Sequence, residues 1–226
     1  FQAIFSIGSP VQIYSYNNSI IAYFNDEDNT SSYTINGLTG PSSSVSANTW
    51  THFAVVRNGN TYTAYVNGVA GSSLTSSDTV ASSSNAPAIG TYLPAPTTYE
   101  FNGHISNLRL VKGTAVYTSN FTPSTSKLTA ITNTKLLTCQ SNRFIDNSAS
   151  GHAITPTGTP AVTAFGPFLT SSVYKAGTNG ASVYMDGDGD YLQAANSADF
   201  DLGTGNFTWE CYANIDDITR TQWFFS

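Results

Sequence analysis

Charged residues are unusually few in this 226-residue sequence. Only 10% of the residues are Asp, Glu, Lys or Arg, well below the usual share, so Ser, Thr, Asn and Gly supply the polar surface. Lys and Arg number 8 against 14 Asp and Glu, which gives a formal net charge of −6. So few and so scattered positive charges exclude binding to the phosphate backbone of a nucleic acid.

Long apolar runs are also missing. No stretch approaches the roughly 18 consecutive apolar residues that a membrane-spanning helix needs, so membrane insertion is not expected. The sequence opens on Phe1, without a start methionine and without a basic segment followed by an apolar one, as a secretory signal would have. We therefore expect a piece cut from a longer polypeptide.

Cysteine is rare and lacks a recognisable spacing. Cys139 and Cys211 are too few for a disulfide scaffold and do not have the spacing of a zinc site. Both lie in apolar, strand-like runs, KLLTCQ and FTWECYA. Two interpretations stay open: a pair of buried thiols, or a disulfide that joins two strands.

The shortage of glutamate argues against catalysis. Retaining glycosidases need two carboxylates about 5 Å apart, and the glutamates of this chain are Glu27, Glu100 and Glu210, far apart in sequence. The histidines are not accompanied by the Gly-x-Ser-x-Gly turn of a serine hydrolase. We predict that the chain is not an enzyme and requires no cofactor.

What the sequence does contain is short runs of alternating apolar residues between Gly, Asn, Ser and Pro, a pattern typical of a β-sandwich. The clearest unit is WTHFAVVRNGNTYTAYVNGVAG, where Asn58-Gly59 predicts a two-residue hairpin turn that pairs Val56 with Thr61. One face of this hairpin is predicted to be core, and the other, which carries His52, to be wetter. The core face is predicted to consist of Phe53, Val55, Tyr62 and Ala64.

The stretch DGDGD is the most ligand-like motif. Asp186, Asp188 and Asp190 alternate with glycines and are able to surround a hard cation such as Ca²⁺, which takes six to eight oxygen ligands. The full calcium-loop pattern is incomplete, because no Glu stands at the twelfth position. The alternative is a tight turn between two paired strands.

Several stretches resemble laminin-G-like, concanavalin A-like sandwich domains. SVYMDGDGDYL and GNFTWECYANI are similar to the opening strands of that family, WTHFAVVRNGNTYTAYVNG to its central hairpin, and FNGHISNLRLVKGTAVYTSNFTP to its closing strands. The closing strands and TKLLTCQSNRFIDNSASGHAIT are also similar to tandem modules in fibre and surface proteins of marine phages and bacteria. The resemblance implies an antiparallel jelly-roll sandwich and a location outside the cell, on a cell surface or on a virion.

The order of these pieces departs from the family. The opening strands come last, and the phrase QAIFS near the start returns as QWFFS at the end. This predicts a tandem repeat cut in mid-domain. We expect residues 1–141 to hold central and closing strands, 142–180 a linker, and 181–226 the opening strands of the next repeat. The last segment either completes a neighbour's sandwich, which we favour, or folds back onto its own chain, and the two phrases should occupy equivalent positions.

A structural repeat of a fibre, built from copies of itself and weakly adhesive to glycans, is the function that these features favour. Sugars bind through stacking on aromatic rings and hydrogen bonds from amides and hydroxyls, often at loops. Candidate glycan contacts are Tyr92, Tyr99, Asn102 and Tyr117. The alternative is a carbohydrate-binding module from a secreted polysaccharide-degrading enzyme.

Overall fold

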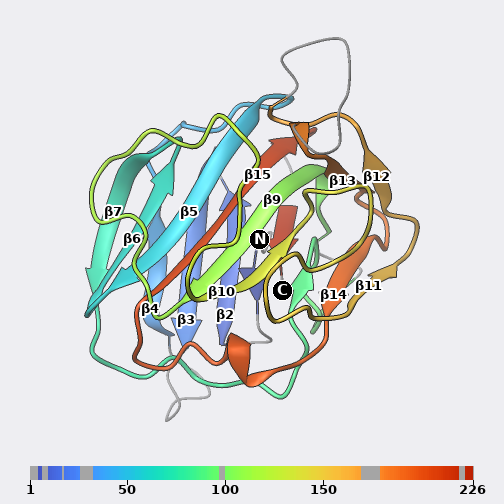
Figure 1. Ribbon diagram of the computed structural model, residues 1–226. Helices are drawn as coiled ribbons and strands as arrows, with labels where there is room; N and C mark the ends of the chain where they lie inside the picture. The colour runs from blue at the N-terminus through green and yellow to red at the C-terminus, as the bar shows by residue number, and fades with distance from the viewer. Residues whose placement is uncertain are drawn as a thin grey trace.

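The computed structural model describes residues 5–6, 10–16, 18–25, 33–96, 100–168, 179–218 and 222–225. In these ranges the chain forms two antiparallel eight-stranded sheets packed face to face, a jelly-roll β-sandwich (Figure 1). The all-β sandwich predicted from the alternating apolar runs is confirmed. None of the helices in the described residues is long and apolar enough to cross a membrane.

Sheet 1 has the strand order β11-β14-β8-β1-β2-β3-β4, with β16 paired to β2 and β8. Its strands are β1 (Phe5–Ser6), β2 (Val11–Tyr16), β3 (Ser19–Asn25), β4 (Tyr33–Thr39), β8 (Ala88–Ile89), β11 (Ile154–Thr157), β14 (Tyr191–Ala194) and β16 (Gln222–Phe225). β2 and β3 form a hairpin, and Asn18 in its turn has φ 59°, which asparagine tolerates better than most residues.

Sheet 2 has the order β12-β13-β9-β15-β5-β6-β7, with β10 paired to β9. Its strands are β5 (Trp50–Asn58), β6 (Thr61–Val66), β7 (Val69–Thr75), β9 (Asn102–Lys112), β10 (Thr134–Thr138), β12 (Ala161–Thr163), β13 (Ser182–Asp186) and β15 (Phe207–Ile215). A 3₁₀ turn, η1 (Ala198–Phe200), lies between β14 and β15.

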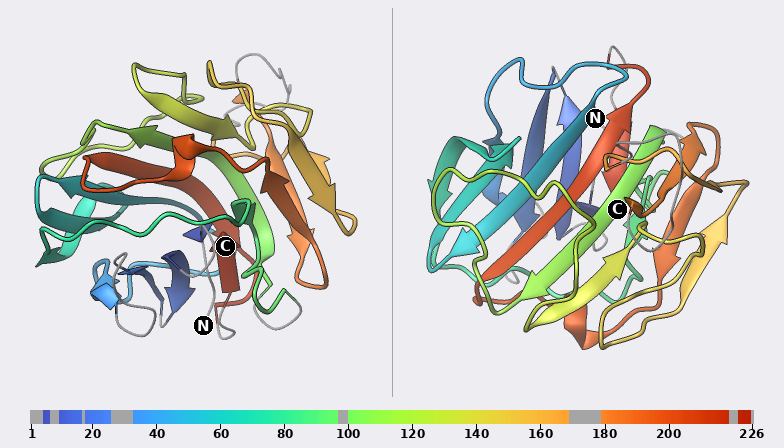
Figure 2. Two further views of the ribbon diagram at one scale, coloured as in Figure 1. Left: turned by 90° about the horizontal axis from the view of Figure 1, so that it is seen from below. Right: turned by 45° about the horizontal axis from the view of Figure 1, so that its top comes forward.

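The core lies between the two sheets and follows from the two-residue period of the strands. In β3, Ile20, Ala22 and Phe24 are fully buried, whereas the residues that alternate with them point to the outer face. Trp209, the third residue of β15, is the largest fully buried side chain in the described residues. Figure 2 shows the two layers from below, with β2 and β3 under the layer that holds β5, β15 and β9.

The segment from residue 181 onward completes the sandwich of its own chain. β15 lies between β5 and β9 at the centre of sheet 2, where Glu210 is opposite Ala54 on one side and Arg109 on the other (Figure 1). β13 continues the same sheet beyond β9, and β14 pairs with β8 in sheet 1. The described strands β13, β14 and β15 thus pair with strands of residues 1–141 of the same chain.

The serine- and threonine-rich stretch 142–180 contributes two strands that its composition does not predict. β11 pairs with β14 in sheet 1, and β12 pairs with β13 in sheet 2. Its described residues 142–168 thus run along one side of the sandwich and extend both sheets there.

The β5–β6 hairpin has the predicted faces but a different register. Asn58 pairs with Thr61 and Val56 with Thr63, so the predicted pairing of Val56 with Thr61 is wrong by two residues. The turn is Gly59-Asn60 with Gly59 at φ 59°, which matches the glycine-first requirement of a type II′ turn. A shift of two residues keeps every side chain on its face, so the predicted core residues of this hairpin are all buried in the main core.

One corner joins the two sheets through a serine. Ser72 on β7 accepts a hydrogen bond from the Thr39 amide at 2.8 Å and donates one to the Thr39 carbonyl at 3.0 Å. Gly71 permits this approach, because a Cβ there would lie 2.3 Å from the carbonyl carbon of Gly40. The last residue of β4 is therefore bonded to the edge of the opposite sheet.

Candidate functional site

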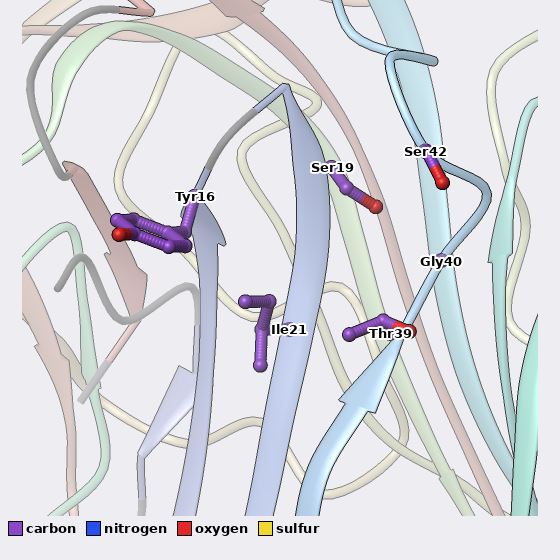
Figure 3. Close-up of a pocket in the computed structure, with 6 residues that line it drawn as sticks. All are labelled: Tyr16, Ser19, Ile21, Thr39, Gly40 and Ser42. Atoms are coloured by element: carbon purple, nitrogen blue, oxygen red, sulfur yellow. The ribbon is translucent and has the colours of Figure 1, made fainter.

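A hollow of about 260 Å³ opens on the outer face of sheet 1, at the end where β2, β3 and β4 meet their loops (Figure 3). Tyr16 comes from the end of β2, Ile21 from β3, and Thr39 from the end of β4. The complete lining consists of Tyr16, Ser19, Ile21, Thr39, Gly40 and Ser42. The site combines one aromatic ring, one aliphatic side chain and several hydroxyls, and none of its side chains is charged.

The rim of the hollow is held in place by short-range hydrogen bonds. Ser19 donates to the Pro41 carbonyl at 3.0 Å, and the Gly40 amide donates to the Ile20 carbonyl at 2.9 Å. Gly40 has no room for a side chain, because a Cβ would lie 2.6 Å from the Ile20 Cγ2 atom and 2.8 Å from Val66. The loop after β4 is therefore packed directly onto the core, and the hollow is a preformed feature.

A row of tyrosines extends from the hollow along the same face. The rings of Tyr14 and Tyr23 are stacked with centroids 5.6 Å apart, and Tyr23 lies 4.7 Å from Tyr33. Gln12 donates a hydrogen bond to the Tyr33 hydroxyl at 3.2 Å. Tyr16 and Tyr33 are 40% and 37% exposed, whereas Tyr14 is buried, and this burial is the main reason that its pKa is raised. We call Tyr14, Tyr16, Tyr23 and Tyr33 the tyrosine strip.

Sequence reasoning missed the hollow and the tyrosine strip, although a signal was present. In VQIYSY the alternation places Tyr14 and Tyr16 on the face opposite Val11 and Ile13, and the two-asparagine turn continues that face into β3. Following the period outward as well as inward would have found the exposed tyrosines.

The predicted glycan contacts do not form one site. Asn102 is the first residue of β9. The Tyr117 hydroxyl donates to Glu210, and Glu210 pairs with Arg109, which lies on β9 seven positions after Asn102. At about 3.3 Å per residue this separates Asn102 from Arg109 by roughly 20 Å. Tyr92 is partly buried against the main core, and Tyr99 lies outside the described residues.

The outer face of sheet 2 carries a buried charge cluster instead. Glu210 is fully buried and accepts hydrogen bonds from Arg109 Nε at 2.8 Å and from the Tyr117 hydroxyl at 2.8 Å. His52 Nε2 lies 3.0 Å from the Oε2 atom of Glu210, the same oxygen that accepts from Tyr117. Burial acts to raise the pKa of Glu210, but the bonds and charges of His52 and Arg109 outweigh it and hold that pKa below its usual value.

A segment that crosses the face, residues 113–133, covers this cluster. Its Tyr117 and Phe121 rings stack at 3.6 Å, and Phe121 also packs against His52 and Tyr65. The expectation that His52 lies on a wetter face is wrong, because the side chain is 1% exposed beneath this segment. Since Glu210 has no access to solvent, the cluster is a structural anchor and its carboxylate cannot reach a substrate.

The carboxylates of DGDGD serve a turn between β13 and β14. Asp186 accepts a hydrogen bond from the Asp188 amide at 2.8 Å, and Asp190 accepts from the Thr159 amide and, at 3.3 Å, from the Asp186 amide. Asp190 is buried, and burial raises its pKa. In the part of the chain that the structure describes, no three His, Cys, Asp or Glu side chains are grouped to hold a metal ion. Calcium binding by these aspartates stays a prediction.

Both cysteines are free thiols in the core. Burial raises the pKa of Cys139 to about 12 and that of Cys211 well above its usual value, with Cys139 as the second cause for Cys211. The interpretation as a pair of buried thiols describes this structure, and a disulfide between them stays a prediction.

Comparison with known proteins adds one finding to this geometry. No curated protein and no solved structure matches the chain. Residues 3–117, from before β1 to beyond β9, match the laminin-G family described as the concanavalin A-like lectin/glucanases superfamily. The matched region includes the hollow, the tyrosine strip and the central hairpin of sheet 2. The chain therefore belongs to the concanavalin A-like lectin/glucanase superfamily.

Proposed function

We propose that this chain is a non-enzymatic repeat of an extracellular or virion-surface fibre, and that it attaches weakly to glycans through the outer face of β2, β3 and β4. The observation that carries the proposal is the hollow beside Tyr16, which continues into the tyrosine strip. Sugar rings stack on exposed aromatic rings, and hydroxyl and amide groups at the rim complete their hydrogen bonds.

Several features support attachment in preference to catalysis. Glu210 is sealed under the crossing segment, and the described Asp186 and Asp190 carboxylates are bonded to backbone amides. The hollow itself is lined by hydroxyls, backbone and apolar groups, and none of its side chains is a carboxylate, an imidazole or an amine. A site of this composition holds a neutral ligand without transforming it.

Repetition compensates for a weak single site. A shallow hollow of this size gives modest affinity, but copies joined in a fibre raise the effective concentration of every further contact. The two similar phrases at residues 2–6 and 222–226 support such a repeat, as does the strand order, in which the opening strands of the family follow the closing ones. On this proposal the chain is one period of the repeat, with boundaries at 1–141, 142–180 and 181–226.

A glycan array tests the attachment. Purified protein should bind a subset of glycans at high surface density, and Tyr16→Ala and Tyr33→Ala should each reduce that signal at least several-fold. Phe165→Ala is the matched control, because Phe165 is 46% exposed but lies away from sheet 1, against Trp50 and His104. Absence of binding at every density, or equal loss in the control, would overturn the glycan proposal. Repeating the array with a chelator tests the calcium prediction separately.

The second candidate is a carbohydrate-binding module of a secreted polysaccharide-degrading enzyme, which the same hollow favours. It differs in what surrounds the chain in the full-length protein. Flanking sequence that repeats this one at about the spacing of the two phrases supports the fibre, whereas a flanking catalytic domain supports the module.

A further inference from the structure

One position in sheet 1 is shared by two strands. Between β2 and β8 lie both β1 and β16, and each is antiparallel to each of those neighbours. β1 and β16 therefore run in the same direction. They also come from the two similar phrases, QAIFS and QWFFS.

The registers show how the two strands divide the position. Along β2, Gln222 and Trp223 pair with Ser15 and Tyr14, and the next residues of β2, Ile13 and Gln12, pair with β1. The partners that β1 supplies there are Phe5 and Ser6. Along β8, Phe225 pairs with Ile89 and Ser6 with the adjacent Ala88. β16 thus leads in line into β1.

Neither strand uses the whole position. β2 has 6 residues, whereas β1 has 2 and β16 has 4. β1 and β16 pair with different residues of β2, so each occupies only part of one strand position. Pairing at such a position is weakly specified, so an equivalent strand from another molecule is able to replace one of the two strands.

The connections decide which strand is able to leave. β1 is tied to β2 by residues 7–10, so it stays beside its own β2. β16 is tied to β15, in the opposite sheet, by residues 216–221, which span roughly 20 Å when extended. That length carries β16 either to its own sheet 1, about 10 Å away, or outward to another molecule.

We propose that β16 of one copy pairs between β2 and β8 of a second copy, so that the copies are joined head to tail. This inference rests on the proposed function as a fibre repeat and names the contact that joins its units. The exchanged strand makes the same bonds as in the closed chain, so the exchange adds little energetic cost. Since the donated strand and the receiving position are different surfaces, each copy donates to the next, and the contact repeats from copy to copy.

A mixed disulfide tests the exchange. Ser15 and Gln222 are opposite each other in the register, and directly opposite residues of antiparallel strands have Cα atoms within the range that a disulfide bridges. Ser15→Cys and Gln222→Cys are placed in separate chains of different mass, refolded together over a range of concentrations, and oxidised. We expect a mixed disulfide species that contains one chain of each kind and increases with concentration.

Two controls make the result decisive. A chain that carries both substitutions should form the same bond within itself at high dilution, and each single variant refolded alone should give no species with that bond. An internal bond in the double variant without any mixed species overturns the proposal. Failure of both bonds also overturns it, because β16 would then not lie beside β2.

The test is independent of glycan attachment. A mixed disulfide in a protein that binds no glycan supports the strand exchange and removes the adhesive part of the proposed function. Glycan binding that depends on Tyr16, without any mixed disulfide, supports the adhesive part of the proposed function and removes the strand exchange.

Discussion

The two outer faces of the sandwich differ in where they place charge. On sheet 2, Glu210 lies buried beneath the crossing segment (113–133), where it binds both Arg109 and His52. On sheet 1, the hollow and the tyrosine strip are uncharged and partly exposed. A chain with only 10% charged residues thus places three ionisable side chains under a cover, whereas the described residues of the hollow and the tyrosine strip carry no charge. The covered face contributes stability, and the open face is available for contact.

Removal of Glu210 should produce the largest effect. Glu210→Ala leaves the Arg109 guanidinium buried without its carboxylate, and loss of one partner of a buried ion pair typically costs about 3–5 kcal/mol. Urea unfolding should therefore show a much lower midpoint with an unchanged slope. A loss below about 1 kcal/mol would mean that the cluster contributes little and that the two faces do not differ as described.

Gly68 tests whether the crossing segment is fixed to the sheet. A Cβ at Gly68, where φ is 77°, would lie 1.9 Å from the Phe121 carbonyl oxygen, so Gly68→Ala should cost about 2–4 kcal/mol from backbone strain and overpacking together.

Gly59→Ala is the matched control for that substitution. Gly59 also has positive φ, in the other hairpin turn of sheet 2, but nothing lies within 4 Å of its added Cβ, so the expected loss is only about 1–2 kcal/mol. Equal losses in thermal or urea unfolding would contradict a tight contact between the β6–β7 turn and the crossing segment.

Acid should weaken the covered face. The pKa of Glu210 lies below its ordinary value of 4.5, so its stabilisation is complete above about pH 4.5 and is lost as the pH falls through the lower folded-state pKa. Each unit of depression corresponds to about 1.4 kcal/mol. The free energy of unfolding, measured against pH, should fall less steeply in Glu210→Gln than in the unaltered chain.

Some acid sensitivity should remain in that variant. Burial acts to raise the pKa of Asp199, but Lys135 and Ser150 outweigh it and hold it low, so Asp199 contributes with the same sign. Identical pH profiles for the two proteins would show that Glu210 has no depressed pKa.

Ser72→Ala should have a moderate effect at the corner between the sheets. It removes the hydroxyl that bonds both the amide and the carbonyl of Thr39, at an expected cost of about 1–2 kcal/mol. Hydrogen exchange at the Thr39 amide should accelerate by a larger factor than exchange in β5. Uniform acceleration throughout the chain would indicate global destabilisation only.

Tyr16→Ala should have the smallest effect on stability. Its side chain is 40% exposed at the edge of the hollow, so the change in the free energy of unfolding should stay within about 0.5 kcal/mol. Urea unfolding measures this directly. A loss comparable to that of Glu210→Ala would show that the open face also maintains the fold.

The fold was largely predictable because every second residue of a strand faces the core, so apolar residues alternate along the sequence. The β2–β3 and β5–β6 hairpins and the main strands β9 and β15 follow from this period and from the turn residues. The β5–β6 register was not predictable, because shifts of two residues preserve the buried face and a glycine fits either turn. β11 and β12 were not predictable, because they are short edge strands with too few apolar residues to show an alternation.

The candidate site was less predictable, because it depends on neighbours distant in sequence. Glu210, Arg109 and His52 each stand singly in an apolar strand, and only the pairing of β15 with β5 and β9 brings them together. Tyr117 was predicted to contact a glycan, whereas in the structure its hydroxyl donates a hydrogen bond to Glu210. The order of residues in sequence does not reveal which tyrosines a loop will cover.

The hydrogen bonds of Ser72 at the corner between the sheets bear on aggregation through strand edges. Low charge gives weak mutual repulsion, and an unpaired strand edge is a template for uncontrolled addition of other strands. By binding the Thr39 backbone, Ser72 occupies groups that an incoming strand would otherwise use. At this corner, one amide and one carbonyl are therefore already bonded and are not offered to an added strand.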